Sequence, residues 1–420
     1  MKDKDLKCLV CGANNIKNVV DLGDFPIATT YSDSPNEKIK KTNLGLSICT
    51  ECNLIQNSNP VNPADVYNKT YDYITGASIA HKVHLVARIN DYITYFNLDD
   101  ESNVLEVASN DGCFQDVMLE NGIRSIGIEP SEVPANVAKA KGHNVVVDFF
   151  NTDLVRNLNL EKSINVVIMN NVITHTHNPV EMLIAAKNCL STSGIVVLEC
   201  MYLGDQLENH SFETIYHGNY TYLSLYSISL LADRANLEIC GAEIIDSHGS
   251  SIRVWMKNKC TSSSSSVDTP RVQLLEIREK ELRLGYDLLP NLLNKIGEFG
   301  FTISKFTSNF IKFINKEIDL GHTIVGYGAA AKTATYISLL GDASQCIQFV
   351  CDINENKWGK YFPGTDIEIR NPSVLTENNY TIIVFPWNLF SEIKGQFELM
   401  NIHGNVVNIK SIIEGDQHAS

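Results

Sequence analysis

The sequence predicts an α/β protein with a small N-terminal domain followed by two domains that each contain a parallel sheet. Three observations support this prediction. Two Cys-x-x-Cys pairs lie within residues 1–70, short apolar runs alternate with helix-like stretches over 71–258, and the same alternation returns over 320–420. Alternating strands and helices are typical of a doubly wound parallel sheet. A chain of 420 residues also exceeds what a single core normally holds.

The overall composition excludes several classes of partner. The net charge of −15 argues against nucleic acid or an anionic membrane surface, since clustered lysine and arginine bind both. The sequence has no run of about eighteen apolar residues and no apolar segment near its start, so we expect neither a membrane span nor a secretory signal. Eleven cysteines, an odd number, suit a reducing compartment. We therefore expect a cytoplasmic protein and leave its oligomeric state open, with a monomer among the options.

Residues 1–70 carry the pattern of a four-thiolate metal site. Cys8 and Cys11 form the first pair, and Cys49 and Cys52 form the second. Two such knuckles place four sulfurs around one ion, which is the tetrahedral set that zinc prefers and which leaves no open position for chemistry. A redox pair would need one Cys-x-x-Cys beside a βαβ unit, and unrelated buried thiols are the other alternative. The matched pairs favour one structural zinc ion.

Residues 71–258 contain the pattern of a ligand-binding sheet edge. The expected strands cover 104–107, 125–128, 144–147, 166–170 and 195–199. The first strand ends in a turn of small residues, 108–112, and the second ends in an acid, Glu129. Small turn residues allow a ligand to approach the backbone, and an acid after the second strand can accept both ribose hydroxyls. The turn lacks the G-x-G-x-x-G dinucleotide fingerprint, and an ordinary strand-to-helix turn is the alternative interpretation.

The last third of the chain contains a second strand–turn–helix pattern. Residues 259–319 are expected to form a flexible linker and amphipathic helices that bridge two domains. Within 320–420, HTIVGYGAAAKTATYI predicts a strand, a small-residue turn and a helix, and Asp352 closes the next strand. This unit is either a nucleotide site or a tightly packed turn. The segment Gly326–Thr333 misses the G-x-x-x-x-G-K-[ST] phosphate loop only at Ala331, and that mismatch favours packing.

Taken together, these segments resemble bacterial S-adenosylmethionine (AdoMet)-dependent sugar C-methyltransferases, which act on nucleotide-linked 4-keto-deoxysugars. Glu106-x-x-x-Asn110-Asp-Gly112 is similar to the AdoMet turn of class I methyltransferases, the two knuckles precede it, and the GYGAAAK turn follows it. The resemblance covers nearly the whole chain. It implies a zinc-binding domain, a central class I (Rossmann-like) methyltransferase domain and a C-terminal Rossmann-like α/β domain, with the outer domains closing on a nucleotide-sugar.

The resemblance also assigns residues to roles. The AdoMet-binding positions would be Glu106, Ala108, Ser109, Asn110, Gly112, Glu129, Pro130, Asp148, Phe149 and Asn170. In this assignment Glu106 lies near the sulfonium end, Glu129 binds the ribose, and Asp148 lies at the adenine edge. The catalytic candidates are Tyr73, His175, Tyr216 and His217, and the substrate-binding candidates are Tyr222, Lys332 and Asn388.

The chain departs from the family at the expected catalytic pair. The family motif reads roughly I-Y-x-E-H, whereas here Gly218 and Asn219 replace the glutamate and the histidine. Methylating carbon requires a base that removes a proton beside a ketone and a donor that stabilises the enolate oxygen. His217 or His175 could take over as the base, although an isolated histidine is often only a surface or core residue. Otherwise the enzyme methylates oxygen or nitrogen of a related sugar or small metabolite, or the protein is a binding scaffold without turnover.

Overall fold

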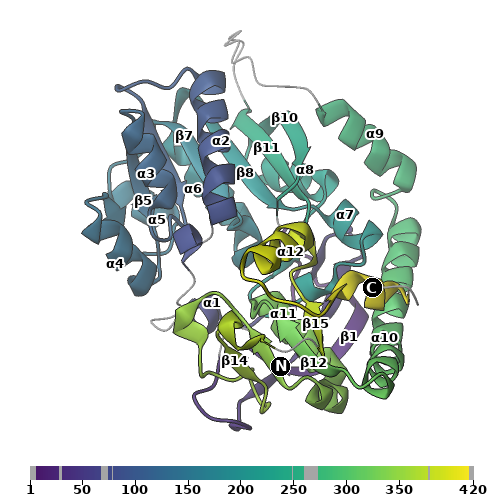
Figure 1. Cartoon of the computed structure of the whole chain (residues 1–420). Helices are drawn as coiled ribbons and strands as arrows, with labels where there is room; N and C mark the ends of the chain where they lie inside the picture. The colour runs from purple at the N-terminus through teal and green to yellow at the C-terminus, as the bar shows by residue number, and fades with distance from the viewer. Residues whose placement is uncertain are drawn as a thin grey trace.

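The computed structural model describes residues 6–27, 31–67, 74–77, 79–247, 249–259, 273–376 and 379–415. Within these residues the strands form three sheets, and helices α9 (Leu274–Leu284) and α10 (Leu289–Asp319) connect the second sheet to the third (Figure 1). The flexible linker expected at the start of 259–319 lies largely outside the described residues. Among the described helices, none combines the length and the apolar character needed to cross a membrane.

The first sheet is antiparallel, and a strand from far along the chain completes it. Its order is β1 (Ile16–Pro26), β2 (Lys41–Cys49), β3 (Ile55–Asn57) and β9 (Thr221–Tyr222). The pairing of β3 with β9 places Tyr222 opposite Ile55. Helix α1 (Pro63–Val66) follows β3, and the side chain of Asn62 caps it by accepting the N–H of Ala64. The second knuckle, β3 and the segment around β9 therefore form one structural unit.

The second sheet has seven strands in the order β10-β11-β8-β7-β4-β5-β6. Its strands are β4 (Asn103–Val107), β5 (Arg124–Ile128), β6 (Val145–Val146), β7 (Ile164–Asn170), β8 (Leu190–Met201), β10 (Leu237–Ile245) and β11 (Ser251–Asn258). The five strands from β4 to β8 pair in parallel, and β11 joins antiparallel to both β8 and β10. The sequence predicts the five parallel strands. It misses the β10–β11 hairpin, where the buried Arg253 pairs with Glu199 and Glu243 and interrupts the apolar pattern.

Helices cover both faces of this sheet. They are α2 (Ile79–Phe96), α3 (Cys113–Glu120), α4 (Glu132–Ala140), α5 (Thr152–Asn157), α6 (Pro179–Cys189) and α8 (Leu225–Arg234), whereas α7 (Leu203–Glu208) packs into the core around α10. Helices α2 and α3 bury apolar side chains on one face, and α5, α6 and α8 do so on the other. The chain crosses from β6 to β7, which lies on the other side of β4. At such a switch point the loops after the two neighbouring strands diverge and leave room for a ligand.

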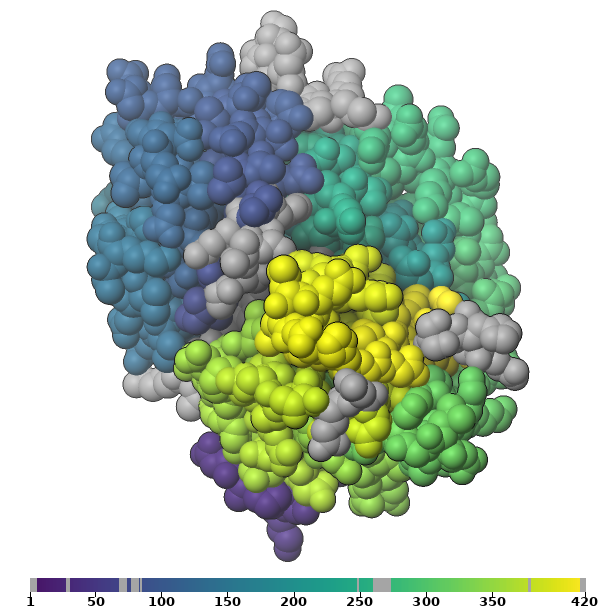
Figure 2. All heavy atoms as spheres, in the orientation of Figure 1, coloured from purple at the N-terminus to yellow at the C-terminus, as the bar shows by residue number. Residues whose placement is uncertain are grey.

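The third sheet is parallel, in the order β14-β13-β12-β15-β16. Its strands are β12 (Thr323–Tyr327), β13 (Phe349–Cys351), β14 (Glu368–Arg370), β15 (Tyr380–Val384) and β16 (Asn405–Asn408), with helices α11 (Ala331–Leu340), α12 (Phe390–Leu399) and α13 (Ile409–Glu414). An isolated bridge between Ser32 and Tyr361 ties the N-terminal part of the chain to this unit. Figure 2 accordingly shows purple N-terminal atoms next to yellow-green C-terminal atoms.

Helix α10 joins the first and third sheets into one apolar core. Its buried positions recur along one face: Leu292, Ile296, Phe299, Ile303, Phe306, Phe310 and Ile314. This face packs against Val20 and Leu46 of the first sheet and against Ile337 and Ile412 of the C-terminal helices. Helix α10 thus packs the N-terminal and C-terminal parts of the chain against each other.

Candidate functional site

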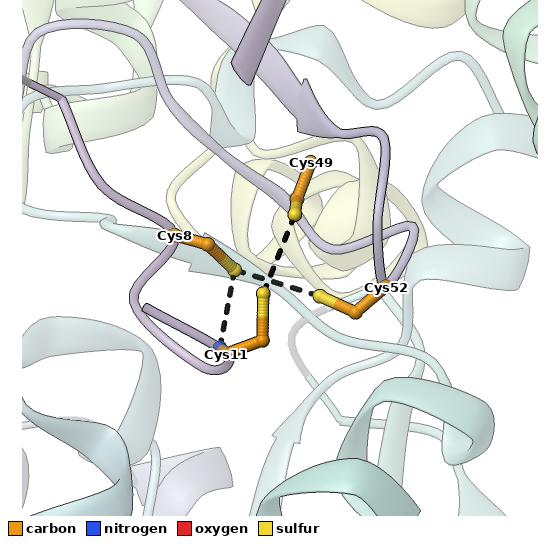
Figure 3. Close-up of side chains that lie close together, drawn as sticks. All are labelled: Cys8, Cys11, Cys49 and Cys52. Carbon is orange, nitrogen blue, oxygen red and sulfur yellow. Dashed lines mark hydrogen bonds between the residues drawn. The ribbon is translucent and has the colours of Figure 1, made fainter. Parts of the chain in front are cut away.

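The four cysteines of the N-terminal region come together as the spacing predicts (Figure 3). The Sγ atoms of Cys8 and Cys52 lie 3.5 Å apart, as do those of Cys11 and Cys49, and all four lie within 4.8 Å of one another. The two knuckles use the same turn, in which a backbone N–H four residues on donates to the carbonyl of the first cysteine. The close contacts run between the knuckles, which suits one shared ion better than a redox pair within one knuckle.

The electrostatics of the cluster also fit a cation. The contact between Cys8 and Cys52 lowers the pKa of the Cys8 thiol and raises that of the Cys52 thiol, and burial raises the pKa of Cys49 to about 11. Four neighbouring thiols cannot all ionise alone, because each thiolate disfavours the next. A divalent ion reverses this effect and binds all four as thiolates. The donor set therefore fits zinc.

The turn after β4 has the backbone that its sequence suggests. Ala108, Asn110 and Gly112 all have positive φ values, of 59°, 50° and 74°. At Gly112 a Cβ atom would lie 2.6 Å from Cδ2 of His143, so a larger residue would both strain the backbone and collide. Glu129 joins the turn to the end of β5, because its carboxylate accepts the N–H of Asn110 at 3.0 Å. The ends of the first two parallel strands are thus fixed together.

Negative charge gathers at this edge. Glu106 is only 6% exposed, and its Oε2 atom has no hydrogen-bond partner among the described residues. Burial, followed by the charges of Glu129 and Asp111, raises its pKa well above the ordinary carboxyl value. A cationic ligand would relieve this repulsion and supply the missing partner. AdoMet carries a sulfonium and an ammonium group, so the arrangement of carboxylates fits it.

The other predicted cofactor residues lie at the same edge of the sheet. Pro130 follows Glu129 after β5, and Asn170 ends β7 with a buried Oδ1 atom that has no partner among the described residues. Beyond β6, Asp148 accepts the backbone N–H of Phe149, whose ring is 45% exposed. The hydroxyl of Ser109, in the turn itself, is also buried without a described partner. The predicted cofactor residues therefore come from four adjacent strand ends, those of β7, β4, β5 and β6.

A short segment from before β4 folds onto the turn. Tyr73 itself lies outside the described residues. Directly after it, in the 3₁₀ turn Thr75–Ala77, the N–H of Thr75 donates to the side chain of Asn110 at 2.8 Å, and the N–H of Gly76 donates to Asp111 at 3.2 Å. The turn Thr75–Ala77 is therefore anchored beside the predicted AdoMet site.

His175 stands at the neighbouring strand end, in the 3₁₀ turn after β7. Its Nδ1 atom lies 2.6 Å from the carbonyl oxygen of Gly218. A carbonyl only accepts hydrogen bonds, so Nδ1 carries the proton and Nε2 keeps a lone pair. Burial lowers the pKa of His175, which keeps the ring neutral near pH 7. The ring of Tyr216 lies 6.2 Å from the His175 ring, centre to centre.

His217 has a different environment. It is 1% exposed, and its Nε2 atom lies 3.1 Å from the carbonyl of Thr42 in β2. Its neighbour Asn219 is also buried and donates to the carbonyl of Thr214 at 3.2 Å. The ring of His217 is thus directed into the N-terminal sheet. Of the two histidines considered as a base, the geometry favours His175.

The three substrate-binding candidates lie on different elements. Tyr222 is buried in β9 and lines a small apolar cavity with Leu46 and Leu207. Lys332 lies in the first turn of α11, where burial lowers its pKa and Glu213 opposes this effect. Asn388 lies in the 3₁₀ turn after β15. The structure brings Lys332 near Glu213, and it does not join Tyr222 to the other two.

No motif in the sequence singles out Glu213, which links two distant parts of the chain. Its two carboxylate oxygens accept hydrogen bonds from the hydroxyl of Tyr336 at 2.9 Å and from the indole N–H of Trp387 at 2.8 Å. It therefore fastens the segment around Tyr216 to the C-terminal unit. The partners are 123 and 174 residues away in the sequence, so no local spacing could reveal them.

The C-terminal GYGAAAK turn is satisfied from within the protein. The N–H of Ala329 donates to Asp352 at 2.7 Å, and the carbonyl of Ala329 accepts from Tyr31 at 2.8 Å and from Lys357 at 2.6 Å. Gly328 has a φ of 93°, and a Cβ there would overlap the ring of Pro386. At Gly328 and Ala329 these contacts favour the packing interpretation over a nucleotide site, and they do not involve Lys332.

Comparison with known proteins identifies related regions along the whole chain. A zinc binding domain family matches residues 8–67, a methyltransferase domain family matches 67–240, and the C-methyltransferase C-terminal domain family matches 246–408. The C-methyltransferase NovU of Streptomyces niveus is 24% identical over 392 residues, which cover 92% of this chain and 91% of that protein.

Solved structures are similar to about half of this chain. The PH0226 protein from Pyrococcus horikoshii OT3 is 15% identical, with 47% of this chain and 97% of that chain covered and a TM-score of 0.38. A SAM-dependent methyltransferase from Archaeoglobus fulgidus is 20% identical, with coverage of 48% and 87% and a TM-score of 0.34.

The matched families follow one another in the order in which the structure presents the four-cysteine cluster, the seven-stranded sheet and the C-terminal sheet. The four thiols fit zinc, and the carboxylates at the strand ends fit AdoMet. The protein is therefore an AdoMet-dependent methyltransferase with a four-cysteine zinc site, and its C-terminal part matches the C-terminal domain of C-methyltransferases.

Proposed function

We propose that the protein methylates a carbon atom of a nucleotide-linked 4-keto-deoxysugar, with His175 as the general base. The observation that carries the proposal is the bond between Nδ1 of His175 and the Gly218 carbonyl, which leaves the Nε2 lone pair available beside the predicted AdoMet crevice. A neutral imidazole at the end of β7 replaces the glutamate–histidine pair that the family motif would place at residues 218 and 219.

In this mechanism Nε2 of His175 accepts the proton from the carbon beside the ketone, and the electrons of that C–H bond move onto the ketone oxygen. The hydroxyls of Tyr216 and Tyr73 would donate hydrogen bonds to this oxygen as its charge develops. Bound AdoMet supplies the electrophilic methyl group. The residues of the crevice contribute mainly by holding the carbon and the methyl group in line.

The remaining assignments belong to the same proposal. Glu106, Glu129 and Asn170 would bind AdoMet together with the turn residues 108–112, with Pro130, and with Asp148 and Phe149 at the adenine. Lys332, Asn388 and Tyr222 would bind the nucleotide-sugar, whose diphosphate suits a lysine. In this proposal segments 1–70, 71–258 and 320–420 act as three domains, with 259–319 as the bridge. The reaction would take place in the cytoplasm on a small-molecule substrate.

One observation favours a second candidate function. With Gly218 and Asn219 in place of the family pair, a single histidine remains as the proposed base, and methylation of oxygen or nitrogen makes smaller demands on a base than methylation of carbon. The acceptor would then be a hydroxyl or an amine of a related sugar.

The test is mass spectrometry of the enzyme incubated in deuterated water with AdoMet and a panel of 4-keto and 4-amino nucleotide-sugars. We expect a product that gains one methyl group, together with deuterium wash-in beside the ketone that also occurs without AdoMet. The His175→Asn variant should lose the wash-in while it still binds AdoMet. Methylation without wash-in would establish the oxygen or nitrogen alternative. AdoMet binding with no product from the panel would contradict both candidate functions.

A further inference from the structure

The carbonyl oxygen of Gly218 accepts two hydrogen bonds from different parts of the chain. One donor is Nδ1 of His175 at 2.6 Å, and the other is the hydroxyl of Tyr67 at 3.2 Å. Tyr67 directly follows helix α1 in the N-terminal region, 151 residues away from Gly218. The rings of Tyr67 and His175 also lie close, with centres 5.8 Å apart. The N-terminal region therefore contacts the Gly218 carbonyl, which fixes the tautomer of His175.

A glycine at position 218 makes this second hydrogen bond important. Glycine restricts the adjoining peptide groups less than any other residue, so the carbonyl direction needs an external constraint. The backbone at 218 does not require glycine, since its φ is not positive. The surroundings do favour it, because a Cβ atom would lie 3.1 Å from the Tyr67 hydroxyl, 3.1 Å from the ring of Tyr216 and 3.2 Å from Val66. Tyr67 thus lies against the space in which a side chain at 218 would begin.

The N-terminal sheet also holds the residues between Gly218 and Tyr222. The backbone N–H of Asn57 in β3 donates to the carbonyl of Tyr220 at 2.9 Å, and its side chain donates to the carbonyl of Asn219 at 3.5 Å. The neighbouring Gln56 holds the first knuckle, with Leu9 donating to it at 3.0 Å. The contact of Tyr67 is therefore one of several that attach this segment to the zinc-binding region.

From these contacts we infer that Tyr67 is a positioning residue for the methyl-transfer reaction, which orients the Gly218 carbonyl and thereby keeps the His175 proton on Nδ1. The inference rests on the proposed function of His175 as the base. It gives the zinc-binding region a role in catalysis beyond folding. Tyr67 does not exchange protons with the substrate in this role, and its effect is transmitted through a backbone oxygen.

The decisive variant is Tyr67→Phe, which keeps the ring and removes only the hydroxyl. Tyr31→Phe is a matched control, because the Tyr31 hydroxyl also donates to a backbone carbonyl distant in the sequence, that of Ala329 in the turn after β12, at 2.8 Å. Two measurements apply to each protein. The first is functional: the pH profile of kcat, together with the AdoMet dissociation constant. The second is the ¹⁵N spectrum of the histidine side chains, with His175 assigned by its loss in His175→Asn.

We expect Tyr67→Phe to lower kcat about three- to tenfold, the usual value of one hydrogen bond, with AdoMet affinity unchanged within about twofold. The ¹⁵N shifts of His175 should move from a pure Nδ1–H tautomer towards a mixture, and the acid limb of the pH profile should shift. Tyr31→Phe should change none of these quantities. The second variant, Gly218→Ala, should cost less activity in the Tyr67→Phe background than in the native protein, because the hydroxyl that meets the new Cβ is gone.

Unchanged His175 shifts and an unchanged pH profile in Tyr67→Phe would overturn the inference, whatever happens to stability. A loss confined to AdoMet affinity or to the unfolding temperature would also overturn it, because it would show a merely structural role. The spectrum separates this failure from failure of the proposed function. If His175→Asn keeps full activity and deuterium wash-in, the base assignment is wrong, while the tautomer measurement still reports on Tyr67.

Discussion

Two strand–turn–helix units of this protein share a sequence pattern and differ in what satisfies it. After β4, a turn of small residues meets Glu129 from the end of β5, and after β12 a similar turn meets Asp352 from the end of β13. Each acid accepts a backbone N–H of its turn, from Asn110 at 3.0 Å and from Ala329 at 2.7 Å. Up to this point the two units are built alike.

Each turn also has a lysine that donates to one of its carbonyls, Lys141 to Asp111 at 2.8 Å and Lys357 to Ala329 at 2.6 Å. The difference lies in one additional buried carboxylate. In the C-terminal unit Lys357 lies 3.5 Å from Asp352 and donates to the carbonyl of Ala329, so the turn is neutralised by its own chain. In the central unit Glu106 adds a buried carboxylate with an oxygen that no described group reaches. The comparison teaches that such a pattern indicates a ligand site only where the protein leaves charge uncompensated.

The largest expected effect is on AdoMet affinity, when the carboxylates of the central and the C-terminal turn are neutralised one at a time. We expect Glu106→Gln to weaken AdoMet binding about 30-fold (~2 kcal/mol), because an amide cannot balance a cationic ligand. Asp352→Asn should leave AdoMet binding within about twofold and lower the free energy of unfolding by about 1–2 kcal/mol. Isothermal titration calorimetry and urea unfolding measure the two quantities. Equal losses of affinity in both variants would contradict the comparison.

Glycine substitutions test the same contrast through the backbone. Gly112→Ala meets His143 at a positive φ, so we expect a roughly tenfold loss of AdoMet affinity. Gly328→Ala also has a positive φ and meets Pro386, so it should destabilise the fold by about 1–3 kcal/mol without changing AdoMet affinity. Gly122→Ala, at a positive φ with no atoms near the new Cβ, is the control for backbone strain alone.

A pH titration should separate binding from stability. The pKa of Glu106 is raised in the folded protein, so between the ordinary carboxyl value and the raised one the folded state holds a proton that the unfolded chain has lost. This contribution therefore makes the free energy of unfolding fall as pH rises through that window. AdoMet affinity should rise over the same window, because the ionised carboxylate binds the cation. Glu106→Gln should remove both trends, and a persisting trend would assign it to another group.

The smallest expected effect is that of Lys357→Met. The pair with Asp352 is partly buried, with side chains 18% and 12% exposed, so its loss should cost about 1 kcal/mol of unfolding free energy. AdoMet affinity should not change, and thermal unfolding with and without AdoMet measures both effects. A new affinity of this variant for cations would show that the C-terminal turn needs only one substitution to behave like the central one.

Much of the fold could be predicted because its signals are local. The runs ending at Val107, Ile128 and Asn170 became β4, β5 and β7, and the four cysteines form the predicted cluster. What the sequence did not reveal depends on distant partners. The two residues of β9 are too few to show a strand pattern, and they pair with a strand more than 160 residues earlier.

The candidate site divides in the same way. The turn around Asn110 and the acid Glu129 follow from spacing within one βαβ unit. The contact of Tyr67 with Gly218 spans 151 residues, and that of Glu213 with Trp387 spans 174. No periodicity or motif records such pairs, because tertiary packing alone brings them together. The catalytic and substrate-binding residues remain predictions, and His175→Asn tests the proposed base among them.

The core shared through α10 has a consequence for synthesis of the chain. The strands β1 and β2 leave the ribosome first, but their apolar side chains pack on α10, and β3 gains its outer neighbour only with β9. The apolar face of the first sheet therefore stays exposed until α10 has been synthesised, when about three quarters of the chain has been made. Early zinc capture by the two knuckles would hold this unfinished sheet together during the delay.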